Sequence, residues 1–289
     1  MKVGAFQIDE PVPNLNKPHA FAILRPWIDA GTVGSLTINF LEDTFQARPL
    51  GRLVEPGNFY DFTRYRPNIR LIDNRRSVDI PNTRIFFAHG PGSNDLVFIH
   101  LLEPHMAGEY YAESVFKVLQ LLGVERYSLI GSMYDSVPHT RPLLVSGYSS
   151  YNLINELHKF NIQQSRYEGP TTITILTSQE AERHNIESLS LIVHLPQYAQ
   201  LEEDYSGHLR LLEILSSLYN LSLDLPPIKE RAEKQHAKLN EAMKNEKQLE
   251  MLIQELEMVY EARENISAEK TPPLSPEIEN FLREIDQRF

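Results

Sequence analysis

The side chains best suited to chemistry lie in residues 129–142, where an apolar run gives way to a polar loop bounded by two prolines. The loop contains an acid, a titratable base, a hydroxyl and a fixed cation, in the order Asp135, His139, Thr140 and Arg141. Ligands of open α/β sheets bind beyond the carboxyl ends of the strands, so we expect this loop to form part of a binding rim. In the alternative interpretation, Asp135 and Arg141 only tie the loop to the rest of the protein.

Three further segments have the same polar character. Glu103 and His105 follow a second apolar run, and Tyr198 follows a third. Tyr167 and Gly169 precede a predicted helix, whose free N–H groups could hold an anion, although a simple capping loop is the alternative there. If the strands are parallel neighbours, their polar ends meet at one edge, so we expect these residues to converge on the same rim.

The usual catalytic patterns are missing. Ser132 follows a glycine, but no second glycine stands two residues later, so the Gly-x-Ser-x-Gly pattern is absent. The chain has no phosphate-binding glycine motif, no His-x-x-x-His pair and no cysteine, which excludes thiolate metal sites and disulfides. We assign no catalytic residue, no metal and no cofactor. The weak alternative is a zinc site built from His100, Glu103, His105 and His139.

Composition and charge narrow the classes of partner. The 289 residues are 42% hydrophobic, enough for a sizeable core in one large domain or two. The formal net charge is −11, and the densest basic run, Arg75-Arg76, is flanked by aspartates. We therefore expect no binding to nucleic acid or anionic membranes. No signal peptide or 18-residue apolar window is present, so we expect a cytoplasmic protein.

The order of the expected elements indicates an α/β fold. Residues 84–88 and 96–101 flank a Gly- and Pro-rich turn and predict a hairpin. A predicted helix over 110–122 then leads to a strand over 127–132, which favours parallel strands. Further strands are expected at 21–24 and 189–195, with helices at 32–45, 151–160, after 171 and at 206–219, while residues 1–20 are expected to form a loop. These alternations predict a three-layer core with a mixed sheet.

Composition changes near residues 223–227, beyond which charge rises and strand-forming residues disappear. We predict a core domain over 1–224 and a charged helical extension over 225–289, with a last short helix over 276–289. Apolar residues of the extension recur in a heptad with 4–3 spacing, from Ile228 to Tyr260. A helix or helix pair packing one face on the core would explain this pattern, and an intermolecular coiled coil is the alternative.

At these same segments the chain resembles the family of proteasome assembly chaperone 2, in its bacterial and archaeal branch. The resemblance covers about residues 15 to 220. It is carried, in chain order, by Leu102-Glu103-Pro104-His105, Gly131-Ser132-x-x-Asp135-x-Val137-Pro138-His139-Thr140-Arg141-Pro142, Tyr167-x-Gly169-Pro170-Thr171 and Leu195-Pro196-x-Tyr198.

The resemblance implies a phosphorylase/hydrolase-like fold, as in nucleoside phosphorylases, and self-association into a homo-oligomer, with a trimer or a multiple of it as the first expectation. Eukaryotic members assist assembly of the proteasome α ring, so proteasome subunits are a candidate partner. Docking chaperones of this kind often end in a hydrophobic residue, tyrosine and any residue. This chain ends in Gln287-Arg288-Phe289, so that docking motif is absent.

Two functions from different classes follow. The first is a non-catalytic, oligomeric assembly-chaperone-like protein that binds other proteins. The alternative is a binding protein or enzyme for a small anionic metabolite, nucleoside-like or phosphate-like, at the strand-end rim. In that case His139 and Arg141 would contact the anion, and Glu103 or Asp135 would serve as acid or base. The sequence leaves enzymatic activity open and favours the first function.

Overall fold

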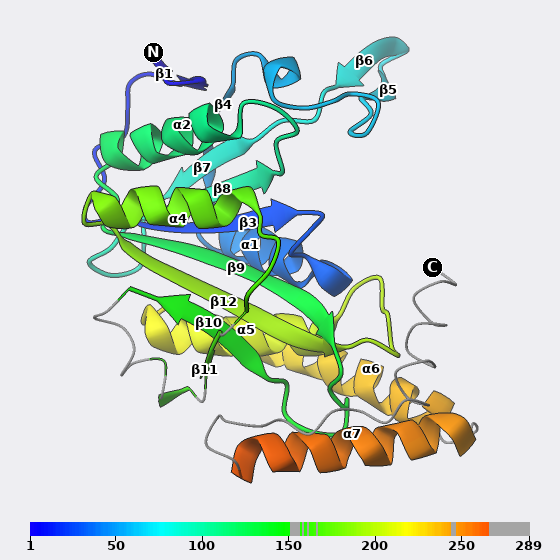
Figure 1. Ribbon diagram of the computed structural model, residues 1–289. Coiled ribbons are helices and arrows are strands. Elements are labelled where there is room, and N and C mark those ends of the chain that lie inside the picture. Colours follow the sequence, from blue (N-terminus) through cyan, green and yellow to red (C-terminus); the bar gives the residue numbers. More distant parts are fainter. Residues whose placement is uncertain (151–156, 158, 161, 166, 244–246, 266–289) are drawn as a thin grey trace.

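The computed structural model describes residues 1–150, 157, 159–160, 162–165, 167–243 and 247–265. Within this part of the chain, ten strands form one mixed sheet (Figure 1). In spatial order these strands are β1 (Lys2–Val3), β2 (Phe6–Ile8), β4 (Arg48–Leu53), β7 (Arg84–Ala88), β8 (Leu96–Leu102), β3 (His19–Arg25), β9 (Arg126–Asp135), β12 (Glu187–Pro196), β10 (Val145–Ser149) and β11 (Gln163–Gln164).

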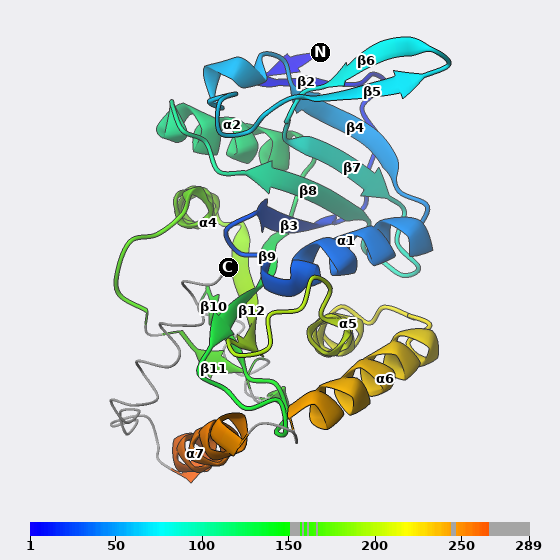
Figure 2. The same cartoon turned by 90° about the vertical axis from the view of Figure 1, so that its right-hand side faces the viewer.

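Helices cover both faces of this sheet, which confirms the mixed α/β class. The described helices are α1 (Val33–Thr44), α2 (Gly108–Leu121), α4 (Ile173–Arg183), α5 (Tyr205–Leu218), α6 (Pro226–Met243) and α7 (Lys247–Asn265), with 3-10 turns at Ala30–Thr32 and Pro56–Asn58. Figure 2 shows α2 and α4 on one face of the sheet and α1 and α5 on the other. None of the described helices is long and apolar enough to cross a membrane.

Four parallel strands form the centre of the sheet, in the order β8, β3, β9 and β12. The predicted hairpin of β7 with β8 and the predicted parallel orientation of β8 and β9 are both confirmed. The structure adds that β3 lies between β8 and β9. β3 suits this central place because residues 20–24 are all buried, and a strand covered on both faces reads as a continuous apolar run.

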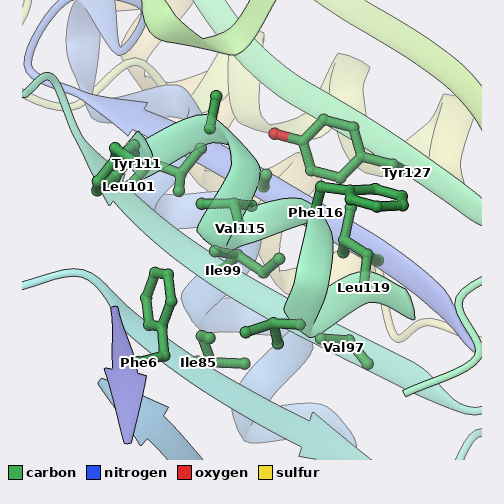
Figure 3. Packing of buried hydrophobic residues seen from close by; sticks show 14 of the residues in the cluster. Phe6, Ile85, Val97, Ile99, Leu101, Tyr111, Val115, Phe116, Leu119 and Tyr127 are labelled. Carbon is green, nitrogen blue, oxygen red and sulfur yellow. The ribbon is translucent and has the colours of Figure 1, made fainter. Parts of the chain in front are cut away.

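The core under α2 is formed by side chains that recur at helical spacing and therefore lie on one face of the helix. Tyr111, Val115 and Leu119 recur every four residues, lie on one face of the helix and are buried. Figure 3 shows them above Val97 and Ile99 of β8. Burial of a valine or leucine side chain contributes about 1.5–3 kcal/mol. The contact of Val115 and Leu119 with the sheet is therefore a main reason that α2 stays packed on it.

The N-terminal segment corrects the expected loop over residues 1–20. Phe6 and Ile8 are fully buried on either side of exposed Gln7, and β2 pairs antiparallel with β4. A three-residue alternation is too short to be recognised as a strand by its pattern. β4 and β10 were also not expected, because Gly51 and Gly147 lower the strand propensity of their segments.

The two C-terminal helices pack on the chain's own core. Ile228 of α6 is buried in the cluster on the α5 face, and Leu252 and Leu256 of α7 are fully buried against Tyr198. The apolar stripe of the heptad pattern is thus used within one chain. The helix predicted over 276–289 and most of that predicted over 151–160 lie outside the described residues, and the domain boundary at 224/225 stays a prediction.

A second sheet stands apart from the body. It is the hairpin of β5 (Asn68–Ile72) and β6 (Arg75–Asp79), which are antiparallel and pair with no other described strand. Figure 2 shows this hairpin projecting beside β4 at the end of the molecule farthest from α7. The sequence analysis did not anticipate it.

Candidate functional site

The polar loop of residues 135–142, called the motif loop below, begins where β9 ends. β9 lies close to the connection between β3 and α1, because the Ser132 amide donates to the Ile28 carbonyl (3.3 Å) and its hydroxyl to the Ala30 carbonyl (2.6 Å). Gly131 permits this approach, since a Cβ there would lie 2.3 Å from the Ile28 carbonyl oxygen. The Gly131-Ser132 pair therefore serves close backbone packing that positions the start of the motif loop.

His139 lies in a closed hydrogen-bond network beneath α6. The Tyr198 hydroxyl accepts from the His139 amide (2.8 Å) and donates its proton to Nδ1 of the neutral His139 ring (2.5 Å). Because Asn240 Oδ1 can only accept, His139 Nε2 carries the ring proton and donates to it (3.0 Å). Burial, together with nearby His236, lowers the pKa of His139, so the ring is neutral near pH 7 and holds the loop to α6.

Arg141 and Thr140 bind α7. Arg141 forms ion pairs with Glu257 (2.9 Å) and Glu261 (2.7 Å), and the Thr140 hydroxyl donates to Glu257. The Tyr260 hydroxyl donates to the Pro142 carbonyl (3.0 Å). This arrangement matches the interpretation in which Arg141 ties the motif loop to the rest of the chain.

A cavity of about 500 Å³ lies between the motif loop, α5 and α6. Its charged lining comprises two arginines and three carboxylates, namely Arg141, Arg210, Asp204, Glu213 and Glu233. An anion held there would meet no excess of positive charge, because the carboxylates offset the two cations. The cavity is therefore poorly suited to a phosphate-like ligand.

Asp135 joins a chain of three side chains that the sequence analysis did not assemble. Asp135 Oδ2 lies 2.8 Å from His194 Nδ1, and His194 Nε2 lies 2.7 Å from the Ser146 hydroxyl. This is the bonding order of a serine-hydrolase triad. Ser146, however, lies inside β10, which pairs with β12 on one side and β11 on the other. Its neighbouring amides thus belong to strand ladders rather than to an oxyanion hole.

Glu103 and His105 form a second group at the end of β8. Glu103 accepts from the Ile173 amide at the start of α4 (3.0 Å), and burial raises the pKa of its carboxyl despite that bond. His105 Nδ1 accepts from the Asp61 amide (3.2 Å), and its ring lies edge-on to Tyr65. Both side chains line an open groove of about 1180 Å³ that also includes residues 170–172.

Tyr167 and Gly169 belong to the connection that precedes α4. The Tyr167 hydroxyl donates to the Pro170 carbonyl (2.9 Å), while most of the ring is exposed. A Cβ at Gly169 would lie 2.7 Å from that hydroxyl. The geometry is that of a local turn, as in the capping alternative.

The expected single rim is divided into two groups. The motif loop and Tyr198 lie against α6 and α7, whereas Glu103 and His105 face the groove beside α4, and the two cavities share no lining residue. β3 separates the ends of β8 and β9, which is the physical reason for the division. Among the described residues, no cluster of three or more His, Asp or Glu side chains could hold a metal ion.

The family model described as PAC2 family matches residues 23–243, most of the chain, including the motif loop and α6. The chain belongs to the PAC2 family. No curated protein matches it. Several solved structures are similar to this PAC2 chain over most of its length.

The first is a PAC2 family protein from Streptomyces avermitilis, with 24% identity and a TM-score of 0.73, covering 82% of this chain and 99% of its own. The second is a proteasome-assembly chaperone homologue from Mycobacterium tuberculosis, with 24% identity and a TM-score of 0.73, covering 81% and 99%. The third is an archaeal proteasome activator from Pyrococcus furiosus, with 16% identity and a TM-score of 0.63, covering 84% and 99%.

Sequence reasoning missed the partners that hold the motif loop of this PAC2 protein. They lie on α6 and α7, roughly 100 residues away in the chain: His236, Asn240, Glu257, Tyr260 and Glu261. The available signal was weak, because these residues are ordinary members of charged helices. Only the heptad, which placed Tyr260 on the apolar stripe, indicated that this face of α7 would be buried.

Proposed function

We propose that this PAC2 protein is a non-catalytic assembly factor that binds other proteins, in the manner of a proteasome-assembly chaperone. One observation carries the proposal: the polar side chains of the motif loop bind the chain itself. His139 is held by Tyr198 and Asn240, and Arg141 by two glutamates. Side chains committed in this way are not presented to a substrate.

The similar proteins support a role in assembly. One is named a proteasome-assembly chaperone homologue and another a proteasome activator. We propose, on the same family resemblance, that the protein is cytoplasmic, that it is a homo-oligomer, and that its sheet is related to that of nucleoside phosphorylases. Proteasome α and β subunits are then the first partners to test.

The decisive experiment mixes the purified full-length chain with purified proteasome α and β subunits of the same organism. We expect native mass spectrometry to show a complex with unassembled subunits, and we expect Arg141→Ala to form it as well. The alternative function predicts the reverse result. A thermal shift with phosphate, nucleosides or nucleotides that disappears in Arg141→Ala, without any subunit complex, would replace the assembly role.

The Asp135–His194–Ser146 chain allows a second test of the non-catalytic role. A fluorophosphonate probe reacts with an activated serine, and we expect no labelling of Ser146. Labelling that is lost in both Ser146→Ala and His194→Gln would show a working nucleophile and would contradict the proposal. Ser136→Ala is the matched control, because Ser136 lies in the motif loop outside that chain of side chains.

A further inference from the structure

The β5–β6 hairpin presents an apolar face to solvent. Side chains alternate between the two faces of a strand, and Ile69 pairs directly with Val78. Ile69, Leu71 and Val78 therefore share one face, with exposed fractions of 67%, 75% and 56%. An isolated two-stranded hairpin is only marginally stable in water, and a cluster of exposed apolar side chains marks a contact surface.

The hairpin and its flanks are also basic, in contrast to the rest of the chain. Residues 66–84 contain five arginines and two aspartates, a net charge of +3, whereas the whole chain carries −11. The remaining residues therefore carry −14. Arg70 and Arg84 are paired with Asp79, but Arg75 and Arg76 have no ion pair within the described part of the chain. A surface that combines apolar and acidic groups would complement this hairpin.

The chain has such a surface in the groove at the ends of β3 and β8. The groove is lined by the exposed apolar side chains Trp27 and Met106, which are 68% and 48% exposed. Its polar lining includes the carboxylates of Asp61 and Glu103, the guanidinium of Arg64, which pairs with Asp61 (3.9 Å), and the His105 ring. Its volume of about 1180 Å³ is large enough for several side chains of a hairpin. We refer to it as the Trp27 groove.

A chain cannot place its own hairpin in its own groove. In Figure 2 the arrowheads of β3 and β8, which mark the groove end, point to the left, whereas the β5–β6 turn extends to the right. We propose that the β5–β6 hairpin of one copy docks in the Trp27 groove of a second copy. Such a head-to-tail contact uses two different surfaces, so it closes into a ring if the rotation permits. This contact between two copies does not depend on which other protein the chain helps to assemble.

The absence of native cysteine allows a direct test by cross-linking. Leu71→Cys and Met106→Cys proteins are prepared separately, mixed and oxidised mildly. We expect a disulfide-linked pair containing one copy of each variant. The control replaces Met106→Cys with Met258→Cys, whose parent side chain is 64% exposed on α7, and should give no such pair. Linkage of Leu71→Cys to itself alone would show symmetric hairpin pairing and would overturn the proposal.

The second measurement is the mass of the full-length chain by sedimentation velocity. We expect a multiple of the 33.3 kDa subunit for the unaltered chain and for Met251→Asp, and the single subunit mass for Leu71→Asp combined with Arg76→Glu. Circular dichroism melts confirm that each variant is folded. An unchanged mass in the hairpin variant would overturn the proposal. A single subunit mass for the unaltered chain would overturn it as well.

Discussion

At the scale of single residues, the motif loop has the composition of an active site but the bonding of a structural joint. The ring proton of His139 lies on Nε2, which donates a hydrogen bond to Asn240 Oδ1, while Nδ1 accepts from the Tyr198 hydroxyl. The guanidinium of Arg141 has a carboxylate at each of two nitrogens. Residue type alone cannot distinguish these roles, because the distinction depends on partners from distant parts of the chain.

Gly131→Ala tests the close approach of β9 to the connection before α1. The added Cβ would lie 2.3 Å from the Ile28 carbonyl oxygen, a contact that only a backbone shift can relieve. We expect a loss of about 3 kcal/mol or more in the free energy of unfolding, measured by urea denaturation. The control is Gly92→Ala, where nothing lies within 4 Å. Equal stability of the two variants would contradict this explanation.

Arg141→Ala tests the electrostatic contact between the motif loop and α7. Glu257 and Glu261 are 24% and 56% exposed, and ion pairs that solvent reaches contribute little to stability. We expect a small loss in the free energy of unfolding, measured by urea denaturation, that becomes smaller when the salt concentration rises to about 1 M. Arg183→Ala removes an exposed pair on α4 and should change stability by less. A loss that is independent of salt would show that packing, not charge, holds the loop.

At the scale of elements, α7 covers the core with one face only. Leu252 and Leu256 are fully buried, whereas Met251 and Met258 are 69% and 64% exposed. The spacing of the buried pair is the four-residue step of a helix face. α7 thus covers Tyr198, the residue that orients His139, and helix docking and loop geometry depend on one another.

Leu256→Ala tests this dependence, with Met258→Ala as its control on the same helix. The first change leaves a cavity in a buried cluster and should lower the free energy of unfolding by about 2–5 kcal/mol. The second removes an exposed side chain and should change it by less than about 0.5 kcal/mol. Chemical denaturation measures both. Similar losses in the two variants would mean that α7 does not pack on the core in this orientation.

At the scale of the whole molecule, buried histidines link stability to pH. His208 is 2% exposed, and burial, followed by the charge of Arg231, lowers its pKa to about 4. The pKa of His19 is also lowered to about 4, mainly by burial. Below pH 6.5 the unfolded chain gains these protons before the folded chain does. With respect to these two histidines, the folded chain therefore has its full stability above pH 6.5 and loses stability as the pH falls towards 4.

His208→Gln tests the sign of this linkage. We expect the difference in unfolding free energy between the unaltered chain and the variant to shrink by about 3 kcal/mol between pH 7 and pH 4, at about 1.4 kcal/mol per pKa unit. Urea denaturation across this range gives the difference directly. A difference that grows as the pH falls would contradict the lowered pKa.

The amino-acid sequence by itself determined the elements whose patterns are local. The apolar run of β3, the Gly- and Pro-rich turn between β7 and β8 and the four-residue periodicity of α2 each follow from neighbouring residues. The family follows as well, because its motif residues are contiguous. β2 and β4 were not predicted, because a three-residue strand and a glycine-containing strand show too little alternation of apolar and polar residues to be recognised.

Only the tertiary structure decided what the candidate residues do. The place of β3 between β8 and β9 divides the expected rim in two, and α6 and α7 fold back to pair with the motif loop over more than 95 residues of chain. These arrangements arise from packing and charge pairing between distant segments. A single sequence records each partner but not which partners meet, and so it predicted a polar rim where the folded chain holds its own helices.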